Sequence, residues 1–280
     1  MDLLQQTKEL CRLYDIKPAR SKGQNFLIEE EIYDQITAAA GLTSNDTVLE
    51  VGPGLGFLTA KLAKKAGRVI AVELDDKLVA VLKTGLAAKN INNVEVVNED
   101  ILKFSIFNFQ FKNFQFKIVA NLPYNITSIF LRKFLEMENK PKLMVLMLQK
   151  EVAERITAKP GKMSLLAVSV QYYSLPEIAQ IVPKENFWPQ PEVGSAIVKI
   201  ITNPPIPLCQ GGKFEKDFFR LVKFGFSAKR KMLKNNLAAG FKISQNEAET
   251  RINLAGLSGK IRAQELSVEA WLKLFTYFYP

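Results

Sequence analysis

Short apolar runs with the character of buried strands alternate with helical segments along the first two thirds of this chain. "TVLEVG" (47–52) and "RVIAVEL" (68–74) are rich in β-branched residues, and between them "LGFLTAKLAKKA" (55–66) spaces its apolar side chains as a helix does. Further strand-like runs follow at 94–100, 117–123, 142–148, 176–182 and 194–202. Strands that alternate with helices favour parallel pairing. The sequence therefore predicts an α/β fold with a doubly wound, mostly parallel sheet of seven strands.

A Pro-rich segment, "NPPIPL" (203–208), interrupts this alternation and predicts a domain boundary. Four segments beyond it suit helices: 213–226, 229–239, 245–255 and 263–278. We therefore expect a sheet domain over residues 1–204 and a small helical domain over 205–280. The second domain carries 13 Lys and Arg against 6 Asp and Glu, and it holds most of the chain's net charge of +10. This charge favours a polyanionic partner.

The composition removes several classes of chemistry. There is no histidine, which excludes Ser-His-Asp and Cys-His catalysis and histidine metal sites. The two cysteines, Cys11 and Cys209, form no CxxC pattern, so neither a disulfide framework nor a metal site is expected. No apolar run approaches the length of a membrane span, and "MDLLQQTKEL" has no signal-peptide pattern. We expect a reduced, cytoplasmic protein that needs no metal.

Three strand ends carry residues suited to a nucleoside. "EVGPGLG" places Gly52, Gly54 and Gly56 between a strand and a helix, where the backbone can approach a ligand closely. Glu73 ends the next strand and suits the two hydroxyls of a ribose, and Asp100 ends the third and suits an adenine amino group. Asp100 taken alone is equally consistent with a solvated strand end, whereas for Glu73 the glycine loop upstream favours ribose binding over that alternative. The glycine spacing lacks the dinucleotide fingerprint, so the combination favours S-adenosylmethionine over NAD as the cofactor.

The fourth strand ends in Asn121-Leu122-Pro123-Tyr124. The side-chain oxygen of Asn121 and the carbonyl of Leu122 are acceptors suited to an exocyclic amine, whose lone pair they would aim at a methyl group. Pro123 fixes the backbone, and Tyr124 offers a ring for stacking on a base. A turn with a core tyrosine is the plainer alternative. No histidine base is required, because the amine loses its proton after it is alkylated.

Taken together, these motifs resemble the ribosomal RNA adenine dimethyltransferase family, whose members modify adenosines near the 3′ end of small-subunit rRNA. The matching stretches are "KGQNFLI" (22–28), "VLEVGPGLGFLT" (48–59), "VELD" (72–75), "NEDIL" (98–102), "NLPYNI" (121–126), "LQKEVAERI" (148–156), "FWPQPEVGSAIV" (187–198) and "FSAKRKMLKNNL" (226–237). They are spread over nearly the whole chain. The resemblance implies a Rossmann-like methyltransferase sheet that binds S-adenosylmethionine, with N6,N6-dimethylation of two adjacent adenosines in small-subunit (16S) rRNA as the reaction. The implied substrate is rRNA in a pre-ribosomal 30S particle, and we expect a monomer.

The resemblance also assigns residues that no local pattern identifies. Gln24, Asn25 and Leu27 would line the methionine end of the cofactor, Asn121 would also touch the cofactor, and Phe187 would stack on the target base opposite Tyr124. In the basic domain, charge alone predicts that four residues bind rRNA phosphates: Lys229, Arg230, Lys231 and Lys234. Their spacing predicts that Arg230 and Lys234 lie on one face of a helix. An ordinary solvated helix surface is the alternative there.

Three alternative functions remain open from the sequence. The large-subunit rRNA adenine N6-methyltransferases that confer macrolide resistance share the cofactor core, although the 187–198 and 226–237 stretches resemble the small-subunit enzymes better. A non-catalytic nucleic-acid-binding factor on the same fold is disfavoured by the intact Asn121–Tyr124 motif. A DNA amino-methyltransferase lacks an evident sequence-reading helix here. The stretch 104–116, which contains six Phe, suggests a hairpin or crossover and receives no function.

Overall fold

The computed structural model describes residues 2–18, 24–106, 115–202 and 212–279. Its centre is a seven-stranded sheet in the order β4-β3-β2-β5-β6-β9-β7. The strands are β2 (Thr47–Val51), β3 (Arg68–Glu73), β4 (Val94–Asn98), β5 (Lys117–Asn121), β6 (Leu143–Gln149), β7 (Leu175–Val182) and β9 (Ser195–Ile201). The pairs from β4 to β6 are parallel, and β9 runs antiparallel to β6. The predicted fold class and its seven strands are confirmed.

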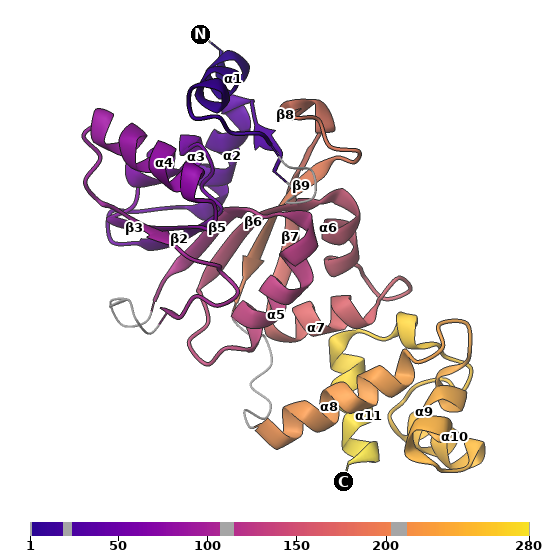
Figure 1. Cartoon of the computed structure of the whole chain (residues 1–280). Coiled ribbons are helices and arrows are strands. Elements are labelled where there is room, and N and C mark those ends of the chain that lie inside the picture. Colours follow the sequence, from indigo (N-terminus) through magenta and orange to yellow (C-terminus); the bar gives the residue numbers. More distant parts are fainter. Residues whose placement is uncertain (1, 19–23, 107–114, 203–211, 280) are drawn as a thin grey trace. The chain divides into compact units, whose positions relative to one another are not determined.

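Helices cover both faces of this sheet (Figure 1). They are α2 (Glu30–Ala40), α3 (Phe57–Ala63), α4 (Asp76–Ala88), α5 (Thr127–Glu136) and α6 (Lys150–Ile156). In Figure 1, α2, α3 and α4 lie on one face of the sheet and α5 lies on the other. The buried strand residues Val48, Val69 and Val119 pack with apolar side chains of α2 and α3. Burial on both faces explains why these strands read as nearly continuous apolar runs.

The strand order places a switch point between β2 and β5. From β2 the chain proceeds to β3 and β4 on one side, and then crosses to β5 and β6 on the other. The connections after β2 and β5 therefore leave the sheet in opposite directions. Crevices at the carboxyl ends of strands beside such a point are where open α/β sheets bind ligands.

The N-terminal region contains two elements that the sequence reading did not anticipate. Helix α1 (Leu3–Leu13) begins after Asp2, whose side chain accepts a hydrogen bond from the Gln5 N–H at 2.8 Å. Strand β1 (Phe26–Leu27) pairs antiparallel with β8 (Phe187–Trp188), which follows the short 3-10 helix η5 (Lys184–Asn186). Two residues are too few to show a strand period, so only the tertiary pairing defines β1.

The chain divides into two compact units, formed by residues 1–153 with 176–202 and by residues 154–175 with 203–280. The helices of the second unit are α7 (Leu165–Tyr173), α8 (Gly212–Gly225), α9 (Leu233–Phe241), α10 (Gln245–Leu254) and α11 (Val268–Phe278), with the 3-10 helix η6 (Ala263–Glu265). Their shared core contains Trp271, Phe218 and, from α7, Val168. The segment 154–175 had been expected in the first domain. It belongs to the second because α7 is apolar on the side that these C-terminal helices cover, as the stacking of Tyr172 on Phe218 illustrates.

Two sequence features fall outside the described residues. These are the Pro-rich break at 203–208 and most of the Phe-rich stretch, residues 107–114. None of the helices in the described ranges combines the length and the apolar character needed to span a bilayer.

Candidate active site at the carboxyl edge of the sheet

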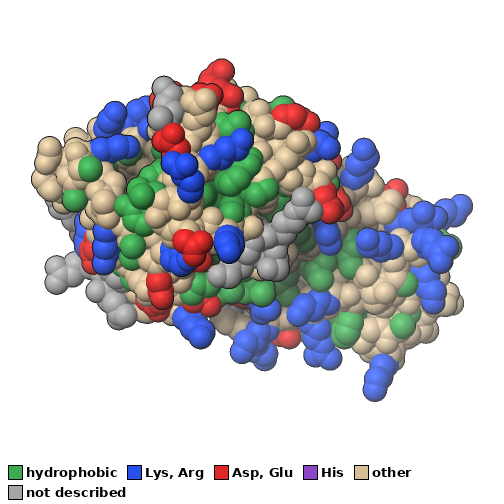
Figure 2. Space-filling view, turned by 45° about the horizontal axis from the view of Figure 1, so that its top comes forward, with side chains coloured by type: hydrophobic (Ala, Val, Ile, Leu, Met, Phe, Trp, Pro, Cys, Tyr) green, Lys and Arg blue, Asp and Glu red, His purple; other side chains and the backbone are tan. Residues whose placement is uncertain are grey.

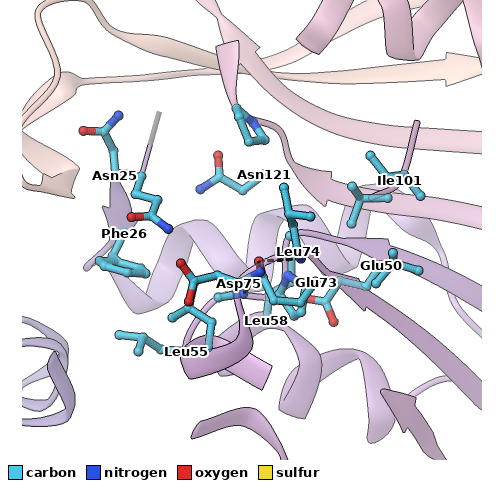
Figure 3. Close-up of a pocket in the computed structure, with 18 of the residues that line it drawn as sticks. Asn25, Phe26, Glu50, Leu55, Leu58, Glu73, Leu74, Asp75, Ile101 and Asn121 are labelled. Atoms are coloured by element: carbon cyan, nitrogen blue, oxygen red, sulfur yellow. Dashed lines mark hydrogen bonds between the residues drawn. The ribbon is translucent and has the colours of Figure 1, made fainter. Parts of the chain in front are cut away.

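A pocket of about 320 Å³ opens at the carboxyl ends of β2, β3, β4 and β5. Figure 3 shows Asn25 and Phe26 at one end of it, Ile101 at the other, and Asn121 and Glu73 between them. The pocket brings together most residues that the sequence predicted for a cofactor: Gln24, Asn25, Leu27, Gly52, Gly54, Glu73, Asp100 and Asn121. Segments 52–54 and 99–101 are far apart in the sequence, and the parallel sheet brings them to one edge. Segment 24–27 reaches the same pocket from the separate β1–β8 ribbon.

The glycine loop between β2 and α3 is built on left-handed backbone. Gly52, Gly54 and Gly56 have φ values of 65°, 58° and 83°. A Cβ on Gly56 would lie 2.6 Å from the Leu82 Cδ1 atom, so both its conformation and its contact with α4 require glycine. Gly56 is not among the pocket-lining residues. Its role is to turn the chain into α3, whereas Gly52 and Gly54 face the pocket.

Glu73 is held in place by three backbone N–H groups. Its Oε1 accepts hydrogen bonds from Leu74 at 2.9 Å and Asp75 at 3.0 Å, and its Oε2 accepts one from Gly54 at 3.2 Å. The residue is only 7% exposed, and burial raises the pKa of its carboxyl. A carboxylate has about four acceptor positions, so capacity remains for a ligand hydroxyl beside these bonds.

Asp100 lies two residues beyond β4, at the start of a turn. Its Oδ1 accepts a hydrogen bond from the Leu102 N–H at 2.9 Å, which leaves Oδ2 for a ligand donor. Next to it, Ile101 lines the pocket, as does Leu74, an exposed residue. Aliphatic side chains near an acid form a site that suits a flat apolar ring with a polar edge.

The Asn121 motif lies at the end of β5 and contributes to the same pocket. Asn121 and Pro123 line it, while Leu122 is buried and donates its N–H to the Met147 carbonyl at 3.3 Å. Tyr124 begins the 3-10 helix η4 (Tyr124–Ile126) and is outside the pocket lining. Its hydroxyl lies 2.9 Å from the Ser195 Oγ atom, and burial raises the pKa of this phenol.

Phe187 lies away from the pocket lining. It pairs with Leu27 across the β1–β8 ribbon, is 3% exposed, and belongs to the cluster that contains Leu27 and Tyr33. The ribbon thus ties the "FWPQP" stretch to the wall formed by residues 24–27. A base-stacking role for Phe187 stays a prediction, because the ring is enclosed in this structure.

Glu50 is a pocket residue that the sequence reading missed. It lies on β2 in "LEVGPG", is 1% exposed, and lines the pocket. Neither of its carboxyl oxygens has a hydrogen-bond partner within the described part of the chain. Burial raises its pKa to about 8, with smaller opposing effects from the nearby Thr59 hydroxyl, which lowers the pKa, and from the charge of Glu73, which raises it. The available signal was an acid inside an otherwise apolar strand, directly before the glycine loop.

The four predicted RNA-binding residues lie in the second unit and do not share one helix. Lys229, Arg230 and Lys231 are exposed in the turn between α8 and α9, and α9 begins only at Leu233. The prediction that Arg230 and Lys234 lie on one helix face is therefore wrong. Lys234 is on α9, where its Nζ forms an ion pair with the Glu249 carboxylate at 2.8 Å. A tight turn at 226–232 interrupts the pattern that had suggested one helix over 229–239.

Comparison with known proteins agrees with this geometry. The family model described as ribosomal RNA adenine dimethylase matches residues 17–279. "Ribosomal RNA small subunit methyltransferase A" of Dehalococcoides mccartyi is 47% identical over 97% of this chain and 92% of its own length. The protein of that name from Enterococcus faecalis is 40% identical over 96% of this chain and 92% of its own length.

Two solved structures share most of the chain's architecture. A dimethyladenosine transferase from Plasmodium falciparum superposes with a TM-score of 0.75 at 28% identity and covers 89% of this chain and 96% of its own. The 23S rRNA methyltransferase ErmE superposes with a TM-score of 0.74 at 29% identity and covers 90% of this chain and 99% of its own. With the family model spanning nearly every residue, this chain belongs to the ribosomal RNA adenine dimethylase family.

Proposed function

We propose that this chain transfers methyl groups from S-adenosylmethionine to the N6 atoms of two adjacent adenosines near the 3′ end of small-subunit (16S) rRNA, as a step of ribosome biogenesis. The observation that carries the proposal is the position of Asn121, which ends β5 at the edge of the pocket that also holds Glu73 and Asp100. An amide acceptor beside a nucleoside pocket is what alkylation of an exocyclic amine requires.

The pocket residues fit S-adenosylmethionine. Glu73 suits the ribose hydroxyls and the free Oδ2 of Asp100 suits the adenine amine. The cofactor also carries an ammonium and a sulfonium, and the buried, unpartnered carboxyl of Glu50 suits positive charge. Burial keeps the Glu50 carboxyl protonated up to about pH 8, because an ionised buried carboxylate without a cation is costly, and a cationic ligand beside it would favour the charged form.

The chain's own contribution to methyl transfer is alignment. S-adenosylmethionine, when bound, supplies an activated methyl group. The Asn121 side-chain oxygen accepts a hydrogen bond from the target amine and favours a nitrogen whose lone pair is localised rather than delocalised into the ring. Tyr124 offers the stacking surface for the base. The methylated nitrogen releases its proton to solvent, so the absence of histidine is no obstacle.

The basic second unit suits the RNA. Figure 2 shows Lys and Arg side chains spread over the helical unit at its right, with few acidic ones on the face in view. The exposed turn that carries Lys229, Arg230 and Lys231 is the site we propose for phosphate contacts. Structured rRNA is read mainly through its shape and backbone, so an exposed cationic turn suits the phosphates while the Asn121 motif acts on the target bases.

The substrate and setting are proposed at a finer level as well. We infer that the rRNA is methylated within a pre-ribosomal 30S particle and that the enzyme acts in the cytoplasm as a monomer. The bacterial relatives are named for the small ribosomal subunit, which supports the particle and the compartment.

A large-subunit activity is the remaining alternative, because ErmE shares the fold. The higher identity to relatives named for the small subunit, 47% and 40% against 29%, favours the small subunit. The test is to incubate the protein with labelled S-adenosylmethionine and undermethylated small or large subunits, and to map the modified bases. We expect two adjacent N6,N6-dimethyladenosines in the small-subunit rRNA. Label confined to the large subunit would contradict the proposal, and no incorporation would favour a non-catalytic binding factor.

A further inference from the structure

Three carbonyl groups of the turn that follows Asp100 converge on a single ammonium group. Lys133 Nζ, from α5, donates hydrogen bonds to the carbonyls of Ile101 at 2.8 Å, Leu102 at 2.9 Å and Phe104 at 2.6 Å. A lysine ammonium has three N–H donors, so all of them are used here. The ammonium is partly buried, and charge-assisted bonds in such surroundings are stronger than bonds between neutral groups.

The opposite side of the same turn faces the pocket. The Leu102 N–H donates to Asp100 Oδ1, and the N–H groups of Lys103 and Phe104 donate to the Asp100 carbonyl, both at 2.8 Å. The turn therefore directs its N–H groups toward Asp100 and its carbonyls toward Lys133. Asp100 and Ile101, the residues we assign to the adenine amine and ring, have their positions set by this double anchoring.

We propose that Lys133 is the positioning residue for the adenine end of the cofactor pocket. This inference rests on the proposed function. Lys133 touches neither cofactor nor substrate; it acts by holding the turn so that Asp100 Oδ2 meets the exocyclic amine of the cofactor. Because α5 begins directly after η4, Lys133 also connects this turn to the element that carries Tyr124. Without the ammonium, the three carbonyls lose their shared donor and the turn relaxes.

The test compares two ligands that differ only at the adenine amine: S-adenosylhomocysteine and its 6-unsubstituted purine analogue, in which a hydrogen on carbon replaces that amine and N1 stays an acceptor. We expect the wild-type chain to bind the first at least about tenfold more tightly, because Asp100 can accept a hydrogen bond only from the amine. In Lys133→Met the affinity for S-adenosylhomocysteine falls by about tenfold while that for the purine analogue changes little, so the preference is lost. Titration calorimetry measures both affinities.

The matched control is Arg132→Met on the same helix, because Arg132 is exposed and, among the described residues, pairs with Glu136 one turn away. We expect Arg132→Met to bind both ligands with the wild-type affinities. A second variant, Lys133→Cys, is alkylated with 2-bromoethylamine to restore an ammonium at the same reach, in a Cys209→Ser background with Cys11 buried. Recovery of the preference supports the proposal.

If Lys133→Met weakens the binding of both ligands equally, Lys133 has a merely structural role and the inference is overturned. A folded Lys133→Met chain that keeps the wild-type preference overturns it as well, and so does an alkylated chain that remains folded without recovering the preference. If the wild-type chain binds neither ligand, the proposed function itself fails, together with this inference. The failures of the two claims are therefore distinguishable.

Discussion

Asn121 is half-buried at the end of β5, where it lines the pocket and is followed by the fixed backbone of Pro123. Its amide acts mainly on the target amine, and its contribution is largest in the transition state. We predict that Asn121→Ala lowers kcat by about 10²- to 10³-fold, the range seen when one preorganised polar contact is removed from an active site. Cofactor affinity, measured by calorimetry, should change much less. Wild-type turnover in this variant would remove Asn121 from the mechanism.

Tyr124 has a second role that its place in the motif does not reveal. Its hydroxyl bonds Ser195, a fully buried residue at the start of β9. We predict that Tyr124→Phe lowers the free energy of unfolding by about 1–3 kcal/mol, because the Ser195 hydroxyl loses its partner in the interior. Urea denaturation measures this loss. The double variant Tyr124→Phe with Ser195→Ala should recover part of it, and strictly additive losses would argue against the coupling.

Glu50 makes stability depend on pH. Its pKa is about 8 in the folded chain against an ordinary value of 4.5, because burial disfavours the charged form. Between these values the folded state keeps a proton that the unfolded state has released. Stability is therefore greatest below the lower value and falls as pH rises through this window, by up to about 1.4 kcal/mol per pH unit.

We predict that Glu50→Gln makes the pH dependence of the unfolding free energy shallower between about pH 5 and 8. Urea denaturation at several pH values measures the slope. The part that remains is expected from Glu73, whose pKa is also raised by burial. An unchanged slope would show that Glu50 is ionised in the folded chain.

Among the elements, the turn between α8 and α9 is held from inside the second unit. The buried side chain of Asn236 donates to the carbonyls of Gly225 at 2.7 Å and Ala228 at 3.0 Å. These bonds fix the residues that precede Lys229, Arg230 and Lys231. The three cations are thus presented by a preorganised turn rather than by a helix face, which lowers the entropy that binding must overcome.

We predict that changing Lys229, Arg230 and Lys231 to Gln weakens binding to small-subunit particles and makes the slope of log affinity against log salt shallower by up to about three. The matched control changes three exposed lysines of α8, Lys213, Lys216 and Lys223, to Gln. Filter binding across a salt series compares the two. If both triple variants lose the same slope, general surface charge rather than this turn binds the RNA.

At the scale of the whole molecule, the second unit is discontinuous in sequence. Its core contains Ala167 and Val168 of α7, both fully buried, together with Phe218 and Trp271 from beyond residue 203. A chain that ends at residue 202 therefore loses the helices that cover α7. Each fully buried aliphatic side chain that is uncovered forfeits about 1.5–3 kcal/mol of hydrophobic stabilisation.

We predict that the fragment 1–202 binds a hydrophobic dye and self-associates, as measured by fluorescence and gel filtration. The matched fragment with Val168→Lys and Tyr172→Lys should do so less, because α7 then presents charge instead of an apolar face. A monomeric, dye-free fragment 1–202 would show instead that the sheet unit is independent of the helices beyond residue 203.

The sequence by itself determined the fold class and the polar ends of the strands. β-Branched and apolar runs mark β2, β3, β5 and β6 because these strands are buried on both faces, whereas β4 at the sheet edge is only partly buried. Parallel strands bring Gly52, Glu73, Asp100 and Asn121 to one edge. These predictions depend on local pattern and on a general rule of topology.

Only the tertiary structure decided the rest. Glu50 is enclosed without a hydrogen-bond partner among the described residues, and Lys133 binds three carbonyls some thirty residues away. Helix α7 belongs to the second unit because helices from beyond residue 203 cover it. Similarly, Arg230 precedes α9 because Asn236 and the chain around it close a turn there. Which side chains are buried and which groups they bond depend on contacts between segments that are distant in the sequence. A stretch of neighbouring residues does not contain that information.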